Sequence, residues 1–89
     1  MTQLSDNYML EMLSKVQPYQ ADIVKTGRSA HLDVHYHEHD WDTPDHSISF
    51  DLYVFEHNSL VKTFEFNSAD TEEELEAILA SVIAYAHSL

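Results

Sequence analysis

The chain has 89 residues, 44% of them hydrophobic, no cysteine, and a formal net charge of −12 at pH 7 with histidine neutral. This length and composition predict one folded domain that covers residues 1–89. The lack of cysteine excludes disulfides and thiolate metal sites. No apolar run reaches the ~20 residues that a membrane-spanning helix needs. We therefore expect a cytoplasmic protein that does not contact membranes.

The charge of the chain is strongly unbalanced, with sixteen acidic residues and four basic ones. A field of this sign repels nucleic acid and attracts basic proteins. Residues 29–61 hold seven carboxylates and six of the seven histidines, and no Lys or Arg. The alternative interpretation is that acidity serves only to keep a small domain soluble.

The N-terminal part predicts a helix over residues 4–16. Ser5 can cap its first turn, and Pro18 is expected to end it. Its apolar stripe consists of Tyr8, Met9, Met12, Leu13 and Val16. Residues 19–26 are ambiguous, because Ile23 and Val24 also fit a short edge strand. Gly27, the only glycine, indicates a turn with positive φ after this segment.

Three later segments, residues 30–38, 48–55 and 60–66, alternate apolar and polar side chains as half-buried strands do. Residues 40–46 are expected to form a loop. For the last two strands, a three-residue loop at 58–60 keeps apolar residues on one face. That register pairs Val54 with Phe64, Leu52 with Phe66 and Glu56 with Lys62. The same reasoning places His35 near Asp51, because a shift of one pair would set Asp33 against Asp51.

The C-terminal part predicts a second helix that Ser68 or Thr71 caps, and residues 71–74 read Thr-Glu-Glu-Glu and match a capping box. Its apolar stripe consists of Leu75, Ile78, Leu79, Val82, Ile83 and Ala86. We therefore predict an α+β two-layer sandwich: an N-terminal helix, an antiparallel sheet of three to four strands, and a C-terminal helix. Both helices are expected to cover the same sheet face and to leave the other face open to solvent.

The histidine-rich strand at residues 30–38 suggests a metal site. His35 and His37 project from the same strand face, and imidazole is a common ligand of transition metals. Asp51 on the neighbouring strand would supply a further ligand, so the candidate metal site is His35, His37 and Asp51. The histidines would alternatively sense pH, since protonation of all seven changes the formal charge from −12 to −5.

No cysteine nucleophile, glycine-rich phosphate loop or G-x-S-x-G turn occurs in the sequence, so we expect no enzyme and no cofactor. Rows of carboxylates on a rigid scaffold can imitate the phosphates of DNA. The leading hypothesis is therefore a small acidic inhibitor or DNA mimic, encoded by a phage or mobile element, that binds a basic nucleic-acid-binding protein and not nucleic acid itself. The alternative is a homodimer, a structural or regulatory domain that pairs through its open sheet face.

The residues expected to contact the partner lie on the central strands and in the acidic loop between them. They are Asp33, Glu38, Asp40, Trp41, Asp42, Asp45, Asp51, Tyr53 and Phe55. Trp41 is the expected hydrophobic anchor, and Tyr53 and Phe55 are the expected centre of the alternative homodimer interface. Four acids of the last helix would extend the anionic row: Glu72, Glu73, Glu74 and Glu76.

Overall fold

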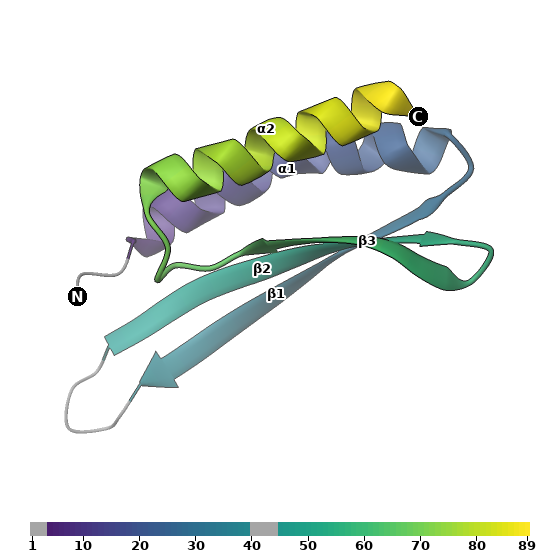
Figure 1. Ribbon diagram of the computed structural model, residues 1–89. Coiled ribbons are helices and arrows are strands. Elements are labelled where there is room, and N and C mark those ends of the chain that lie inside the picture. Colours follow the sequence, from purple (N-terminus) through teal and green to yellow (C-terminus); the bar gives the residue numbers. More distant parts are fainter. Residues whose placement is uncertain (1–3, 40–44) are drawn as a thin grey trace.

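The computed structural model describes residues 4–39 and 45–89, and the side chains of residues 4–36 and 47–89. Its elements are α1 (Asp6–Lys25), β1 (Ser29–His39), β2 (Asp45–Glu56), β3 (Ser59–Phe66) and α2 (Glu72–Ser88). The strands form one antiparallel sheet in the order β1-β2-β3, and both helices lie on the same face of it (Figure 1). This confirms the predicted two-layer α+β sandwich, with three strands. No helix among these residues is both long and apolar enough to cross a membrane.

Helix α1 is longer than predicted, because it continues through Pro18 to Lys25. The expected stop at Pro18 and the possible strand at residues 19–26 are therefore both wrong. Proline removes one helical hydrogen bond, but Pro18 lies on the exposed side of α1, where water can solvate the freed carbonyl. The turns beyond it bury Ile23 completely, and this tertiary packing outweighs the local cost of the proline.

The N-terminal ends of both helices follow the predicted chemistry. The Ser5 hydroxyl accepts a hydrogen bond from the Tyr8 N–H at 3.2 Å, and the Thr71 hydroxyl accepts one from the Glu74 N–H at 3.1 Å. Thr71 is therefore the residue that caps α2. Gly27 has φ +93°, and nothing lies within 4 Å of the position that a Cβ would take. Backbone conformation, and not a lack of space, is thus what favours glycine here.

The turn between β2 and β3 differs from the prediction. It contains two residues, His57 and Asn58, with φ values of 52° and 66°. Both values belong to the type I′ turn that closes two-residue hairpins. Glu56 and Ser59 are paired directly after this turn. The predicted three-residue loop at 58–60 is therefore wrong.

A β-bulge near Val54 and Phe55 adds one residue on β3. Because of this additional residue, the apolar side chains of β3 face the core. Leu52 consequently lies opposite Phe64, and Phe50 lies opposite Phe66. The predicted pairs differ from these by two positions, which is why apolar residues still face the core. The prediction was therefore right about the face to which each side chain points, and wrong about which residues are paired.

The hydrophobic core lies between the sheet and the two helices. The rings of Phe50 and Phe66 stack with centroids 4.6 Å apart and planes 14° apart. The core residues are Met9, Met12, Val16, Ile23, Ala30, Phe50, Leu52, Val54, Phe64, Phe66, Leu75, Val82 and Ala86. The helix-facing side of β1 is less covered toward the end of the strand, where Val34 is 49% exposed. There the hairpin of β1 and β2 diverges from the helices (Figure 1).

Candidate partner-binding face

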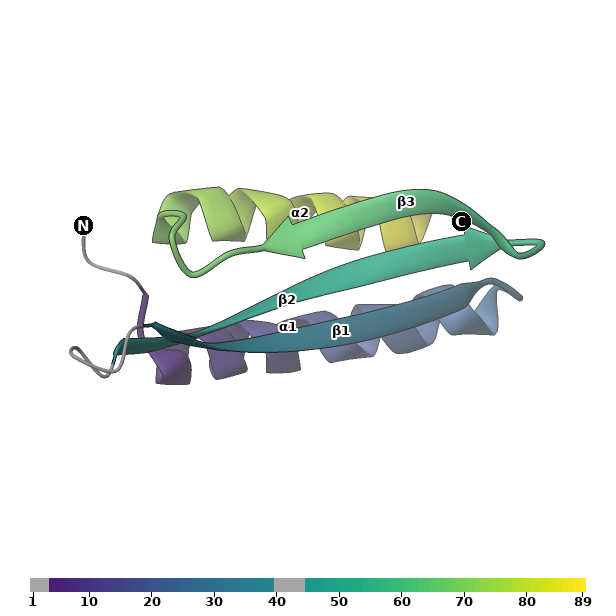
Figure 2. The same ribbon diagram turned by 90° about the horizontal axis from the view of Figure 1, so that it is seen from below.

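The open face of the sheet, on the side away from the helices, is seen in Figure 2. Because paired residues of neighbouring strands point to the same side, the register arranges its side chains in rows. The first row contains His31, Tyr53 and Thr63; the second contains Asp33, Asp51 and Glu65; the third contains His35 and Ser49. The second row, which we call the carboxylate row, has one acid on each strand.

The carboxylate row concentrates negative charge on a rigid support. Side chains that lie directly opposite in an antiparallel sheet have their Cβ atoms ~4.5–5.5 Å apart. Asp33 and Asp51 are opposite one another, and so are Asp51 and Glu65. Like charges in such positions repel each other, so the row costs folding free energy.

The carboxylate row has no Lys or Arg partner within the described part of the chain. The ion pairs that Lys and Arg make there are Lys25 with Asp22, at 4.0 Å, and Arg28 with Glu56, at 3.5 Å. Both pairs lie near the end of the molecule where α1 finishes. Among the described residues, the negative charge of the carboxylate row is therefore not compensated by Lys or Arg.

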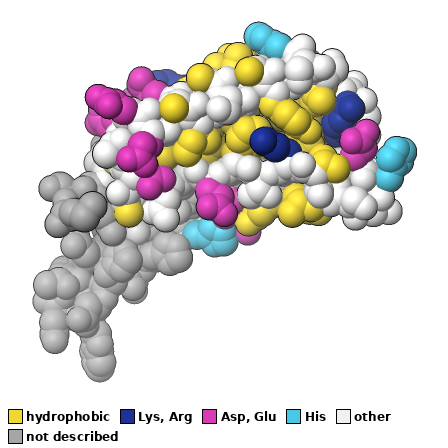
Figure 3. Space-filling view, in the orientation of Figure 1, with side chains coloured by type: hydrophobic (Ala, Val, Ile, Leu, Met, Phe, Trp, Pro, Cys, Tyr) yellow, Lys and Arg dark blue, Asp and Glu magenta, His cyan; other side chains and the backbone are white. Residues whose placement is uncertain are grey.

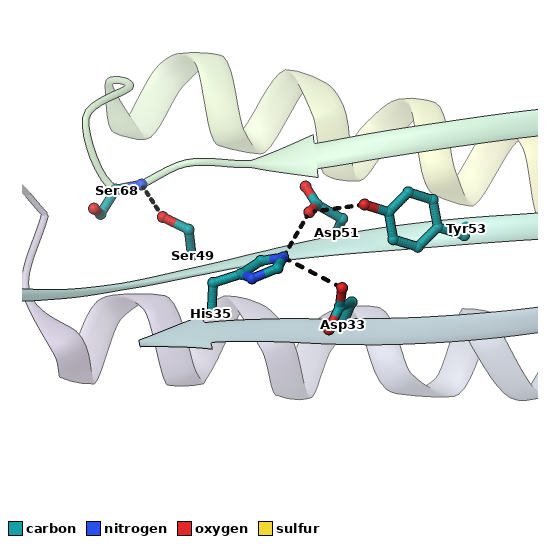
Figure 4. A network of polar contacts seen from close by, with 6 residues as sticks. All are labelled: Asp33, His35, Ser49, Asp51, Tyr53 and Ser68. Carbon is teal, nitrogen blue, oxygen red and sulfur yellow. Dashed lines mark hydrogen bonds and ion pairs between the residues drawn. The ribbon is translucent and has the colours of Figure 1, made fainter. Parts of the chain in front are cut away.

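His35 bridges two of the three acids of the carboxylate row, Asp33 and Asp51. The prediction set His35 near Asp51 in order to keep Asp33 away from Asp51, but the register places the two acids directly opposite. His35 reaches them diagonally: its Nε2 lies 3.2 Å from Asp51 Oδ2 and 3.3 Å from Asp33 Oδ2 (Figure 4). Ionised carboxylates only accept hydrogen bonds, so this nitrogen carries a proton and donates it between them.

The side chains of Asp33 and Asp51 differ in their exposure to solvent and in the number of hydrogen bonds that they accept. Asp51 Oδ2 also accepts a hydrogen bond from the Tyr53 hydroxyl at 3.2 Å, and the Asp51 side chain is only 20% exposed. The Asp33 side chain is 56% exposed. Asp51 is thus fixed by two donors, whereas Asp33 presents its carboxylate to solvent. Partial burial, followed by the negative charge of Asp51, raises the pKa of Tyr53 above its ordinary value of 10.0.

The raised pKa of Tyr53 gives a testable pH dependence. In the unfolded chain this phenol titrates near its ordinary value, so its contribution to stability is complete below about pH 10 and is lost as the pH rises through the folded-state pKa. In the Asp51→Asn variant the pKa of Tyr53 is expected to fall toward the ordinary value. The measurement is the phenolate absorbance, with Tyr53→Phe used to identify this one tyrosine. An unchanged titration in Asp51→Asn would contradict the described contact, and Glu73→Gln on α2 is the control.

The repulsion within the carboxylate row gives a second prediction. Glu65→Gln is expected to stabilise the protein by up to ~1 kcal/mol, because it removes a like charge directly opposite Asp51. The gain should shrink as salt is added, since exposed charges are screened. Urea denaturation at low and high salt measures both effects. Glu73→Gln in the first turn of α2 should instead lose a little stability, because acids there interact favourably with the helix dipole. A loss of stability in Glu65→Gln would show that the row is not repulsive.

The structure brings together only part of the predicted partner-binding set. Asp33, Asp51, Tyr53 and Phe55 all lie on the open face, and Phe55 contacts the His31 ring edge-to-face with centroids 5.6 Å apart. Whether this face pairs two copies around Tyr53 and Phe55 stays a prediction. The remaining members fall outside the described residues or side chains: Glu38, Asp40, Trp41, Asp42 and Asp45.

The acids of α2 do not extend the carboxylate row, because α2 covers the opposite face of the sheet. In Figure 3, most of the Asp and Glu side chains in view gather toward the end of the molecule where α2 begins. Lys25, Arg28 and Lys62 belong to the other end, where α1 finishes and β3 starts. The predicted continuous row of acids is therefore divided between two faces. In addition, many acidic residues lie toward one end of the molecule, and three basic residues belong to the other end.

The candidate metal site is only partly described. His35 and Asp51 are in contact, but the side chain of His37 is not among those described. Within the described residues, no three His, Asp or Glu side chains are grouped in a way that could hold a metal ion. The metal site stays a prediction.

Glu65 was not among the predicted site residues, although the alternation of residues 60–66 assigns it to the open face. Its position opposite Asp51 depends on the β-bulge, which local sequence patterns do not reveal. Ser49 was also missed; its hydroxyl accepts a hydrogen bond from the Ser68 N–H at 3.3 Å and joins β2 to the segment before α2 (Figure 4).

Comparison with known proteins does not assign the chain to a family. No protein-family model matches the chain, and no curated protein or solved structure is significantly similar to it.

Proposed function

We propose that the protein binds a basic protein through its open sheet face and thereby competes with the nucleic acid that this partner holds. The observation that carries the proposal is the carboxylate row: Asp33, Asp51 and Glu65 lie side by side on three strands, without a Lys or Arg partner among the described residues. A row that costs folding free energy and is still present is typical of a binding surface.

The chemistry of the row fits the groups with which proteins hold phosphates. Arg and Lys bind phosphate and carboxylate through the same charge-assisted hydrogen bonds. A partner with such groups on a nucleic-acid-binding surface would therefore accept carboxylates in place of phosphates. The formal charge of −12 would speed the encounter by long-range attraction.

Competition by DNA is the test of this proposal. The protein is immobilised and exposed to a lysate, and the captured proteins are challenged with duplex DNA and with salt. We expect captured proteins that are basic, that bind nucleic acid when purified, and that are released by either treatment. Captured proteins that stay bound in excess DNA would contradict the mimicry, and capture of no basic protein would contradict the binding as well.

A further inference from the structure

The outer edge of β1 is an edge of the sheet. Within the described part of the chain, β1 pairs with β2 on one side only. Alternate residues of an antiparallel strand direct their backbone groups to opposite sides. The carbonyl of Ala30 accepts a hydrogen bond from Gln20 Nε2 at 2.9 Å, which shows that the groups of Ala30 point to the outer edge. Leu32 and Val34 share this orientation, and such an edge is a template for another strand.

Helix α1 adds an uncharged stripe beside this edge. Next to the core stripe, with which it shares Leu13, α1 carries residues at the three- and four-residue spacing of a helix–helix contact: Leu10, Leu13, Gln17, Gln20 and Val24. Leu10 is 47% exposed and Val24 is 49% exposed, although both are apolar. The bond from Gln20 to Ala30 places the stripe on the side of α1 next to the β1 edge. The stripe contains no charge in a chain that is 22% charged.

We infer that two copies of the chain form a dimer in which β1 pairs antiparallel with β1 of the second copy, in a register centred on Val34. The two sheets then form one six-stranded sheet, and the two α1 stripes face each other. Val34 is the midpoint of β1, Ser29–His39. In this register Asp33 lies opposite His35 of the second copy, and the two-fold axis repeats this pair. Leu32 lies opposite Tyr36 of the second copy.

Charge and hydrogen bonding disfavour the neighbouring registers. A register centred on Asp33 sets this acid against its own copy, and like charges directly opposite destabilise a sheet. A register centred on His35 does the same with that histidine. A register centred on Leu32 needs the backbone of Ala30, whose carbonyl is already bonded to Gln20. The register centred on Val34 avoids a like pair at the axis, and it moves Ala30 to the outer end of the paired strands, opposite Glu38 of the second copy.

Helix α1 packs on both β1 and β2, and it runs along β1 when the sheet is seen from below (Figure 2). It therefore lies close to the β1 edge, and the two α1 helices would be neighbours in the dimer. The edge of β3 is less suitable, because its bulge and the charged Lys62 protect it from pairing.

Sedimentation equilibrium tests the dimer directly. Near physiological ionic strength we expect the wild type to have twice the mass of one chain. Val34→Lys sets two like charges against each other at the axis and should weaken the dimer about tenfold or more. Leu60→Lys is the matched control, because Leu60 is a similarly exposed apolar residue of β3 (52%) and should leave the mass unchanged. A wild type that stays monomeric at millimolar concentration would overturn the inference.

A cysteine variant tests the register and does not depend on whether Val34→Lys folds. The chain has no native cysteine, and Val34 is expected ~5.5 Å from its own copy between Cα atoms, a distance that a disulfide can span. Val34→Cys should give a covalent dimer on mild oxidation, and Leu60→Cys should not. Equal cross-linking of both variants would overturn the register. Because each copy carries −12, added salt should strengthen the dimer, whereas it should weaken capture of a basic partner.

Discussion

Replacing Phe50 with alanine is expected to lower the melting temperature by more than ~12 °C. Phe50 is completely buried, and its ring stacks on Phe66 with centroids 4.6 Å apart. Truncation of a buried phenylalanine to alanine costs about 3–5 kcal/mol. In a domain of this size, each kcal/mol shifts the melting temperature by roughly 4–8 °C. A protein of this length has about 4–13 kcal/mol of total stability, so the variant loses a large part of it.

The matched control for Phe50→Ala is Leu60→Ala, which removes an apolar side chain that is 52% exposed. It should change stability by less than about 0.5 kcal/mol. Thermal unfolding followed by circular dichroism compares the two variants at one protein concentration. If Phe50→Ala does not accumulate as folded protein, Phe50→Leu provides a milder core change. Equal melting temperatures for Phe50→Ala and Leu60→Ala would show that the core does not lie between the sheet and the helices.

Neutralising the carboxylate row is expected to weaken binding of a basic partner by about 100-fold. The variant combines Asp33→Asn, Asp51→Asn and Glu65→Gln, which keep the shape of each side chain and remove its charge. A loss of ~1 kcal/mol for each of the three charges removed sums to about this factor. The affinity is measured against a partner identified by DNA-competed capture, at two salt concentrations. The difference between wild type and variant should shrink at the higher salt, because salt screens exposed charges.

The matched control for this variant separates a binding site from net charge. Glu11→Gln, Glu73→Gln and Glu76→Gln neutralise three exposed acids of the two helices, on the opposite layer of the molecule. Both triple variants change the net charge by the same amount. If the open sheet face is the site, the helix variant keeps most of the affinity. Equal losses in the two variants would mean that partners respond only to total charge.

Features set by neighbouring residues could be predicted from the sequence. The N-cap at Thr71 and the strand at residues 30–38 depend on contacts within a few positions, and both predictions are confirmed. The alternation also assigned Asp33 and Asp51 to the open face. Pro18 misled the prediction because burial of Ile23, a tertiary effect, decides whether α1 continues.

The arrangement of the candidate site could not be predicted in the same way. Which acids lie opposite one another depends on the turn at His57 and Asn58 and on the bulge that follows it. A bulge has no reliable sequence signal, and a change in register moves every cross-strand pair. The position of His35 between two aspartates follows from the register and from the rotamer of the imidazole. Neither is encoded in the spacing of histidines along β1.

The separation of charge along the molecule has a kinetic consequence. Three of the four basic residues belong to the end where α1 finishes, and many acids belong to the other end of a body 46 Å long. Such a molecule has a large permanent dipole moment. An approaching cationic surface would rotate it before contact and select which end arrives first. Orientation during diffusion would thus bring the end where α2 begins to a cationic surface first, before any hydrogen bond forms.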